Sequence, residues 1–277
     1  MGILLGVIAA LLLGASDFGA ARAARSVPSI TVTRTALAVS ALLAPILLLF
    51  VRSSWIRRDS LVAACSGLAM MAGLALLYRG YSVARIGIVA PTCSVLLAVV
   101  PVAYDAVRGI RPGSLGAFGM LLGLGGVAMA TYEPGGFGSV RSGVLLGAAS
   151  GVAFGIAFTF MSRTSKASGL SPIVVQRTLA FTVLALVRVA QPSAPLVAIH
   201  RPARVPAIAA GLSAGLAIAS LQLAYRHGAA GPVSVATSQF ATAAVLLSVI
   251  FNKEHLRRSQ GVGIGLAAVG VAFLALG

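Results

Sequence analysis

The sequence predicts an all-α integral membrane protein in which ten transmembrane helices form two inverted five-helix repeats. Of its 277 residues, 58% are hydrophobic and only 9% are charged, whereas a soluble domain carries about 25% charged residues. Its apolar runs approach the roughly 20 residues that a helix needs to cross a bilayer. The first half of the chain also recurs in the second half. The composition therefore excludes an ordinary soluble protein.

Each apolar run is interpreted as one helical span, because backbone amides in hydrocarbon must be satisfied within their own segment. Short connectors marked by Arg, Pro, Ser and Gly separate the runs, and none of them is long enough to be a soluble domain. In order, the ten predicted spans are 3–21, 30–51, 61–79, 84–105, 113–132, 143–162, 172–190, 206–225, 231–251 and 261–276.

The positive charge is spread along the chain. There are 21 Lys and Arg residues against 5 Asp and Glu residues, which gives a formal net charge of +16. In a polar chain this excess would suggest nucleic-acid binding. Here the cations stand singly between apolar runs, where Arg flanks a span and meets lipid phosphates. We therefore expect the lipid bilayer as a partner, and no nucleic acid.

The second half of the sequence repeats the first at offsets of 141 to 147 residues. The recurring anchors are Gly2 to Gly6 with Gly143 to Gly147, Arg34-Thr35 with Arg177-Thr178, Tyr78-Arg79 with Tyr225-Arg226, and Gly119 and Gly126 with Gly263 and Gly270. Five spans in each half is an odd number, so the second half enters the membrane in the opposite sense. We expect two repeats, 1–137 and 138–277, that form one membrane domain with a site between them. Alternatively, duplication only builds a large bundle.

Asp17 is the one acidic residue that lies clearly inside a predicted span. A carboxylate within the membrane is costly and is by default a functional candidate. We expect Asp17 to bind a proton or a substrate amine. The alternative is that it lies near the interface and pairs with Arg22 or Arg34. Its repeat counterpart is Phe158, so the site would be asymmetric.

Uncharged polar side chains gather in the fourth, eighth and ninth predicted spans. Such groups need hydrogen-bond partners inside a membrane, and we expect them to line a substrate cavity together with Asp17. The predicted substrate-binding residues are Asp17, Thr92, Ser94, Gln222, Ser238, Gln239 and Thr242. The alternative is that Ser and Thr only bond across packed helices. Tyr78 and Tyr225 are expected to be interface anchors.

Arg34 and Arg177 each lie about one turn inside a span. Burying Arg costs roughly 3 kcal/mol even on the permissive insertion scale. Both are therefore expected to cap helix carbonyls, bind phosphates or pair with a carboxylate. With Asp17 and Glu254, they form the predicted set of coupling or structural charges.

Cys65 and Cys93 show neither the CxxC pattern nor the Cys/His spacing of a metal site. No Ser/His/Asp arrangement, HExxH motif or phosphate-binding glycine loop stands out. We expect no metal, no cofactor and no enzyme activity.

Several short patterns carry a resemblance to a known family. They are Gly14-Ala-Ser-Asp-Phe18, Arg34 and Arg177 early in spans, Leu-Ala-Tyr225, Pro232, Asn252-Lys-Glu254, Gln260-Gly261 and Gly270. On these residues the chain resembles the EamA-type transporters of the drug/metabolite transporter superfamily over essentially its whole length. The first half departs from the pattern, because the position that matches Glu254 is Val107, with Asp105 two residues earlier.

The resemblance implies efflux or exchange of small metabolites through a central cavity by alternating access. It also implies a multi-pass protein of the cytoplasmic membrane with both termini in the cytoplasm, which the nearly even distribution of Lys and Arg over the connectors does not decide. We expect a secondary transporter, an exporter or exchanger of small metabolites, amino-acid-like compounds or drugs, and leave its oligomeric state open. The alternative is a non-transporting membrane scaffold or lipid-binding protein. A polar pocket at the midplane favours transport, and a core filled by apolar side chains favours the alternative.

Overall fold

The structure is a computed structural model that describes residues 1–84, 86–131, 140–187, 195–198, 202–252 and 258–276. The first half contains α1 (Gly2–Ala23), α2 (Ser29–Leu47), α3 (Arg57–Val83), α4 (Ile86–Val107) and α5 (Ser114–Thr131). The second half contains α6 (Val140–Ser162), the 3-10 helix η1 (Lys166–Ser168), α7 (Ser171–Leu186), α8 (Arg204–Tyr225), α9 (Ala230–Ser238), α10 (Phe240–Asn252) and α11 (Arg258–Leu276). The predicted all-α class is confirmed.

The helices follow the predicted spans with one difference. The predicted span 231–251 is divided at Gln239 into α9 and α10. The helix boundaries follow local chemistry elsewhere: Pro172 occupies the first turn of α7, where its missing N–H costs no hydrogen bond. Gly109 ends the turn after α4 with a positive φ of 76°, a conformation that glycine adopts without strain.

Six helices of the described chain are long and apolar enough to cross a membrane. They are Gly2–Ala23, Ser29–Leu47, Arg57–Val83, Arg141–Ser162, Arg204–Tyr225 and Ala230–Phe251. The outer surface is also apolar: Leu49, Phe50 and Leu121 are 82%, 79% and 73% exposed. Large exposed apolar surfaces mark contact with other apolar matter, and here the lipid tails supply it. The protein is therefore a multi-pass membrane protein.

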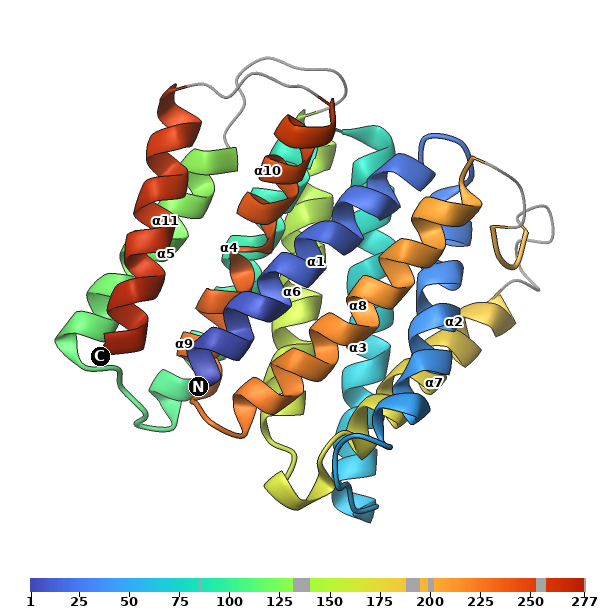
Figure 1. Ribbon diagram of the computed structural model, residues 1–277, viewed down its shortest axis with the longest axis horizontal. Helices are drawn as coiled ribbons and strands as arrows, with labels where there is room; N and C mark the ends of the chain where they lie inside the picture. Colours follow the sequence, from blue (N-terminus) through green and yellow to red (C-terminus); the bar gives the residue numbers. More distant parts are fainter. Residues whose placement is uncertain (85, 132–139, 188–194, 199–201, 253–257, 277) are drawn as a thin grey trace.

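Several contacts between a helix of the first half and a helix of the second half have a counterpart in which the two halves exchange places. α1 packs against α8, and α6 packs against α3. Likewise α2 packs against α8, and its counterpart α7 packs against α3. α1 also packs against α9 and α10, and its counterpart α6 packs against α4. α5 and α11 form a separate pair at one edge of the bundle, and both termini lie at the same end (Figure 1).

The closest helix contacts occur at glycines. Gly14 of α1 lies against the backbone of α10, and Gly151 of α6 lies against the Cys93 carbonyl of α4. In the α5 and α11 pair, a Cβ on Gly126 would overlap the backbone of Ala267. Lipid provides no hydrophobic drive for helices to associate, so close van der Waals packing at small residues holds such bundles together.

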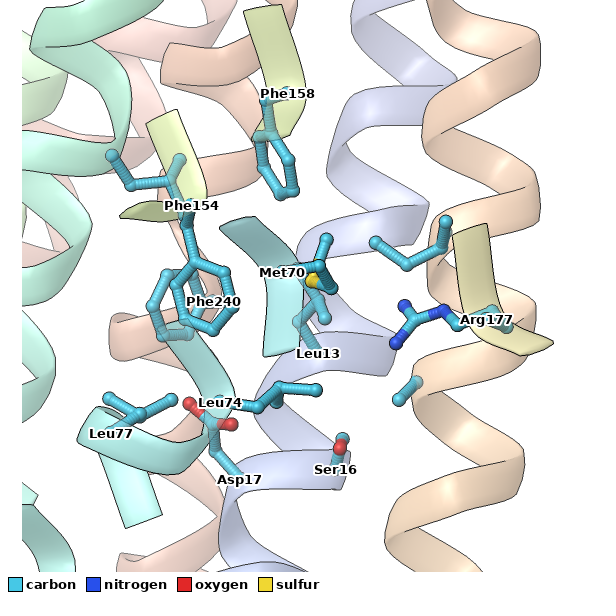
Figure 2. Close-up of a pocket in the computed structure, with 13 residues that line it drawn as sticks. Leu13, Ser16, Asp17, Met70, Leu74, Leu77, Phe154, Phe158, Arg177 and Phe240 are labelled. Carbon is cyan, nitrogen blue, oxygen red and sulfur yellow. The ribbon is translucent and has the colours of Figure 1, made fainter. Parts of the chain in front are cut away.

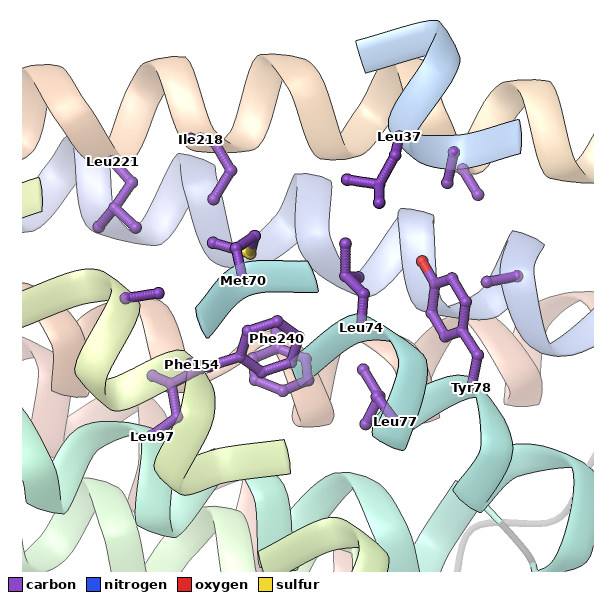
Figure 3. Packing of buried hydrophobic residues seen from close by; sticks show 14 of the residues in the cluster. Leu37, Met70, Leu74, Leu77, Tyr78, Leu97, Phe154, Ile218, Leu221 and Phe240 are labelled. Carbon is purple, nitrogen blue, oxygen red and sulfur yellow. The ribbon is translucent and has the colours of Figure 1, made fainter. Parts of the chain in front are cut away.

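A core of buried apolar side chains surrounds the middle of α1, α3 and α8 (Figure 3). Tyr78 belongs to this core and is fully buried. The prediction that Tyr78 is an interface anchor is therefore wrong, because the side chain packs inward from α3. Its counterpart Tyr225 also turns inward and shares a hydrogen bond with Ser234 at 3.0 Å.

Candidate functional site

A cavity opens in the middle of the bundle between the two halves. The free volume inside it is about 30 Å³ in this conformation. Helices α1, α3 and α4 of the first half and α6, α7, α8 and α10 of the second supply its walls (Figure 2). The lining residues are Leu13, Ser16, Asp17, Met70, Leu74, Leu77, Leu97, Phe154, Phe158, Arg177, Ala214, Ile218 and Phe240.

Most of the lining is apolar, and aromatic rings form one wall. Phe154 and Phe158 of α6 pack with ring centroids 6.5 Å apart, and Phe240 of α10 lies beside Phe154 in the same wall (Figure 2). Met70 adds a flexible, polarisable side chain that adapts to irregular shapes. These walls suit an apolar or aromatic molecular body, because rings stack and pack edge to face on one another.

Asp17 brings a carboxylate into this cavity from the second half of α1. The side chain is only 4% exposed, and its Oδ2 accepts a hydrogen bond of 2.8 Å from the Tyr81 hydroxyl of α3. Asp17 forms no ion pair within the described residues. The alternative prediction, that it pairs with Arg22 or Arg34, is therefore not what the structure shows. A buried carboxylate with a single neutral donor retains unused acceptor capacity.

Arg177 brings a guanidinium into the same cavity from α7. The side chain is 1% exposed, and its buried Nε has no hydrogen-bond partner. The guanidinium and the Asp17 carboxylate occupy separate parts of the lining (Figure 2), and the described part of the chain contains no ion pair to Arg177. Beside it, Gln176 donates from Nε2 to the Ser66 hydroxyl at 2.6 Å, which ties α7 to α3.

Arg34, the repeat counterpart of Arg177, has a different environment. It is also fully buried, but its Nε donates to the Leu184 carbonyl at 3.1 Å. This carbonyl lies in the last turn of α7, where helix carbonyls lack partners within the helix. Arg34 thus caps a helix end and does not line the cavity.

The predicted substrate-binding residues do not all line the central cavity. Of the seven predicted substrate-binding residues, Asp17 alone lines the central cavity. Gln222 donates to the Thr164 hydroxyl at 2.7 Å, at the end of the bundle that carries the termini. Gln239 faces α5, and its Nε2 donates to the Gly123 carbonyl at 3.4 Å.

The other predicted residues also serve helix packing. Ser238 donates within its own helix to the Val235 carbonyl at 2.8 Å, and Thr92 packs against Gly147 of α6. Ser94 is fully buried and Thr242 is nearly so. Glu254 lies outside the described residues. Polar residue type alone does not tell which face of a helix meets the central cavity, and a substrate-binding role for these residues stays a prediction.

Sequence reasoning missed the apolar walls of the cavity. Phe154, Phe240 and Met70 resemble ordinary core residues by type and spacing, and Phe158 was noted only as the counterpart of Asp17. The one available signal was that the position of Asp17 in the first half is occupied by Phe158 in the second half. A repeat position that is acidic in one half and apolar in the other marks a place where the two halves differ in role.

The described residues contain no cluster of three or more His, Cys, Asp or Glu side chains that could hold a metal ion. Cys65 is exposed and Cys93 is buried, and both are free thiols.

Hydrogen bonds between connectors close the end of the bundle that carries both termini. Asp59, at the start of α3, accepts the Ser165 backbone N–H at 2.9 Å and the Ser168 hydroxyl after α6. We name these three residues the Asp59 latch. At the same end, Asp105 of α4 accepts the Gly231 backbone N–H at 2.6 Å, which ties α4 to the start of α9. The latch therefore joins the first half to the second at this end.

Comparisons with known proteins agree with this description. A solved structure titled "Crystal structure of protein" superposes with a TM-score of 0.76 at 18% sequence identity, covering 99% of this chain and 96% of that one. At this identity the likeness shows the fold alone. No curated protein sequence matches the chain. Residues 141–276 match the family described as the EamA-like transporter family, which confirms the resemblance seen in the sequence.

Proposed function

We propose, on the premise that residues 141–276 belong to the EamA-like transporter family, that this protein is a secondary transporter of small molecules. Membership makes it a membrane transporter of the drug/metabolite transporter superfamily. Beyond that, we propose that it exports or exchanges small metabolites, amino-acid-like compounds or drugs across the cytoplasmic membrane.

The observation that carries the proposal is the placement of two opposite charges in one central apolar cavity. Asp17 and Arg177 are both almost completely buried and both line it. Ionisable side chains inside a membrane are costly, and they mark pathways for ions and substrates. A bundle that only had to pack would fill this space with apolar side chains, at a lower cost.

The exchanged helix contacts support an architecture of two inverted five-helix repeats. α1 and α8 run antiparallel, since Gly2 lies beside His227 and Gly19 beside Pro206. Their exchanged partners α6 and α3 also run antiparallel, since Ser150 donates to the Gly73 carbonyl and Ser66 donates to the Ala157 carbonyl, each at 2.8 Å. Inverted repeats around a midplane site are the construction that supports alternating access by rocking of the halves.

The closed end supports the same mechanism. The Asp59 latch joins the two halves at the end that carries the termini, and the repeat counterparts of Asp59, at 203–206, contain no acidic residue. At the opposite end the halves are joined differently, since Thr31 donates to the Pro195 carbonyl at 3.1 Å and Thr35 accepts the Ala198 N–H at 2.8 Å. We propose that the latch holds this side of the cavity closed in this conformation. Breaking it would open that side, and rocking of the halves would then switch access.

A non-transporting scaffold or lipid-binding protein is the second candidate, and the largely apolar lining favours it. Counterflow separates the two. Purified protein in proteoliposomes preloaded with unlabelled compounds from a panel of amino acids, nucleobases and cationic drugs should take up the matching labelled compound. Protein-free liposomes give the background. Uptake equal to the background for the whole panel, by protein that elutes as a folded species, would contradict transport.

We propose that both termini face the cytoplasm. Arg57, at the start of α3, is exposed at the end that carries the termini, and Arg25, after α1, is exposed at the opposite end. In a background without Cys65 and Cys93, Arg25→Cys should react with a membrane-impermeant maleimide on intact cells. Arg57→Cys should react only after permeabilisation, and the reverse pattern would overturn the orientation.

A further inference from the structure

The two counterpart arginines differ at the same atom. The Nε of Arg34 donates to a helix carbonyl at 3.1 Å, whereas the Nε of Arg177 is buried and has no partner. An unsatisfied buried donor on a charged group is among the most expensive features of a protein interior. The cap accounts for the Nε of Arg34. The Nε of Arg177 has no such acceptor within the described residues.

The position of Arg177 makes a ligand the natural partner. Its side chain lines the central cavity and faces into it (Figure 2). The Gln176 bond to Ser66, which in turn donates to the Ala157 carbonyl at 2.8 Å, fixes the adjoining turn of α7 to α3 and α6. The guanidinium is therefore held at the cavity wall by its neighbours, and its buried Nε has no hydrogen-bond partner there.

The shape of the ligand follows from the remaining walls. A guanidinium presents its donors in a planar fork that matches a carboxylate. Phe154, Phe158 and Phe240 offer aromatic contact to whatever is attached to that carboxylate. Asp17 stands at a separate part of the lining, so it does not occupy the anion position.

Resting on the proposed transport function, we propose that Arg177 is the anion-binding residue of the cavity and that the substrates are carboxylates with an apolar or aromatic body. The carboxylate would pair with the guanidinium, and the apolar body would pack on the phenylalanine wall. The negative charge of the ligand would offset the free-energy cost of burying the Arg177 guanidinium.

Equilibrium dialysis with the full-length protein in detergent tests the proposal without transport. The probes are phenylpropanoate and phenylpropanamide, which share an apolar body and differ in charge. Because a hydrogen bond to a charged group is stronger than a neutral one, the wild-type protein should bind the carboxylate at least about tenfold more tightly than the amide.

Arg177→Gln should remove this preference, and Arg177→Lys should retain part of it. The matched control is Arg34→Gln, which removes the counterpart arginine outside the cavity and should keep the preference in the fraction that elutes as folded protein. Equal binding of the two probes by the wild-type protein, including no binding of either, would overturn the proposal even if no variant folds.

Failure of the proposed function gives a different result. A carboxylate preference that depends on Arg177, without counterflow in proteoliposomes, would leave the anion site in place and contradict transport. Counterflow of panel compounds by wild-type protein that does not distinguish the carboxylate from the amide would support transport and remove Arg177 as the anion-binding residue.

Discussion

Asp17→Asn is expected to reduce counterflow by at least about tenfold while leaving the protein folded. Asparagine has nearly the same shape, and its side-chain oxygen can still accept the hydrogen bond that the Tyr81 hydroxyl donates to Asp17. It cannot carry a negative charge or a transported proton. A hydrogen bond to a charged group contributes about 1.5 to 3 kcal/mol, and each 1.4 kcal/mol corresponds to about a factor of ten. Initial rates in proteoliposomes measure the effect.

Tyr81→Phe is the matched control for Asp17→Asn. It removes the hydroxyl that Asp17 accepts and keeps both the ring and the carboxylate. If the charge of Asp17 is what transport requires, the Tyr81 variant should retain more counterflow than the Asp17 variant. If Asp17→Asn shows the same counterflow rate as the wild-type protein, transport does not require the carboxylate.

Asp59→Ala is expected to open the end of the bundle that carries the termini. The variant loses the acceptor for the Ser165 N–H and the Ser168 hydroxyl, and each buried donor left without a partner costs about 1 to 3 kcal/mol. This cost falls on the closed conformation, so the population with an open end should rise by about tenfold. The rate of maleimide reaction with Phe158→Cys, in a background without Cys65 and Cys93, reports that opening.

Phe158 is suited to this measurement because it lines the cavity and lies about one turn before the end of α6. The control is Arg58→Ala, which removes an exposed side chain next to Asp59 and leaves the Asp59 latch in place. A reaction rate that is the same in the Asp59 and Arg58 variants would mean that the latch does not hold this end closed.

The helical fold was predictable because the bilayer imposes one simple rule on each apolar run. Spans of about 20 residues must be helices, and the described helices lie where the runs lie. The divided span at Gln239 was not predictable, because no proline or glycine marks it. The recurring glycines Gly126 and Gly270 were a reliable signal, since both lie in the close contact of α5 with α11.

The site was predictable only where chemistry stands out against an apolar background. Asp17 was identified because a carboxylate in a span is rare and expensive. Gln239 and Thr242 carry polar groups of the kind that lines cavities, yet a helix of this composition gives little sign of which face meets the cavity. Their placement depends on how α9 and α10 pack against their neighbours.

The two arginines show the limit of repeat comparison. Arg34 and Arg177 occupy equivalent sequence positions, and the sequence predicted the same choice of roles for both. In the structure Arg34 caps α7, whereas Arg177 faces the cavity. The difference arises from partners on other helices, which the local sequence does not contain.

The central claim is that the cavity between the halves is the substrate site. Ala214 of α8 lines this cavity, and Leu212, two residues earlier, is 44% exposed on the lipid side. Ala214→Phe would place a ring in the cavity, and Leu212→Phe adds a ring of the same kind outside it. The most direct measurement is counterflow by both variants at equal amounts of folded protein. We predict loss of counterflow in Ala214→Phe and normal counterflow in Leu212→Phe; full counterflow in Ala214→Phe would contradict the claim.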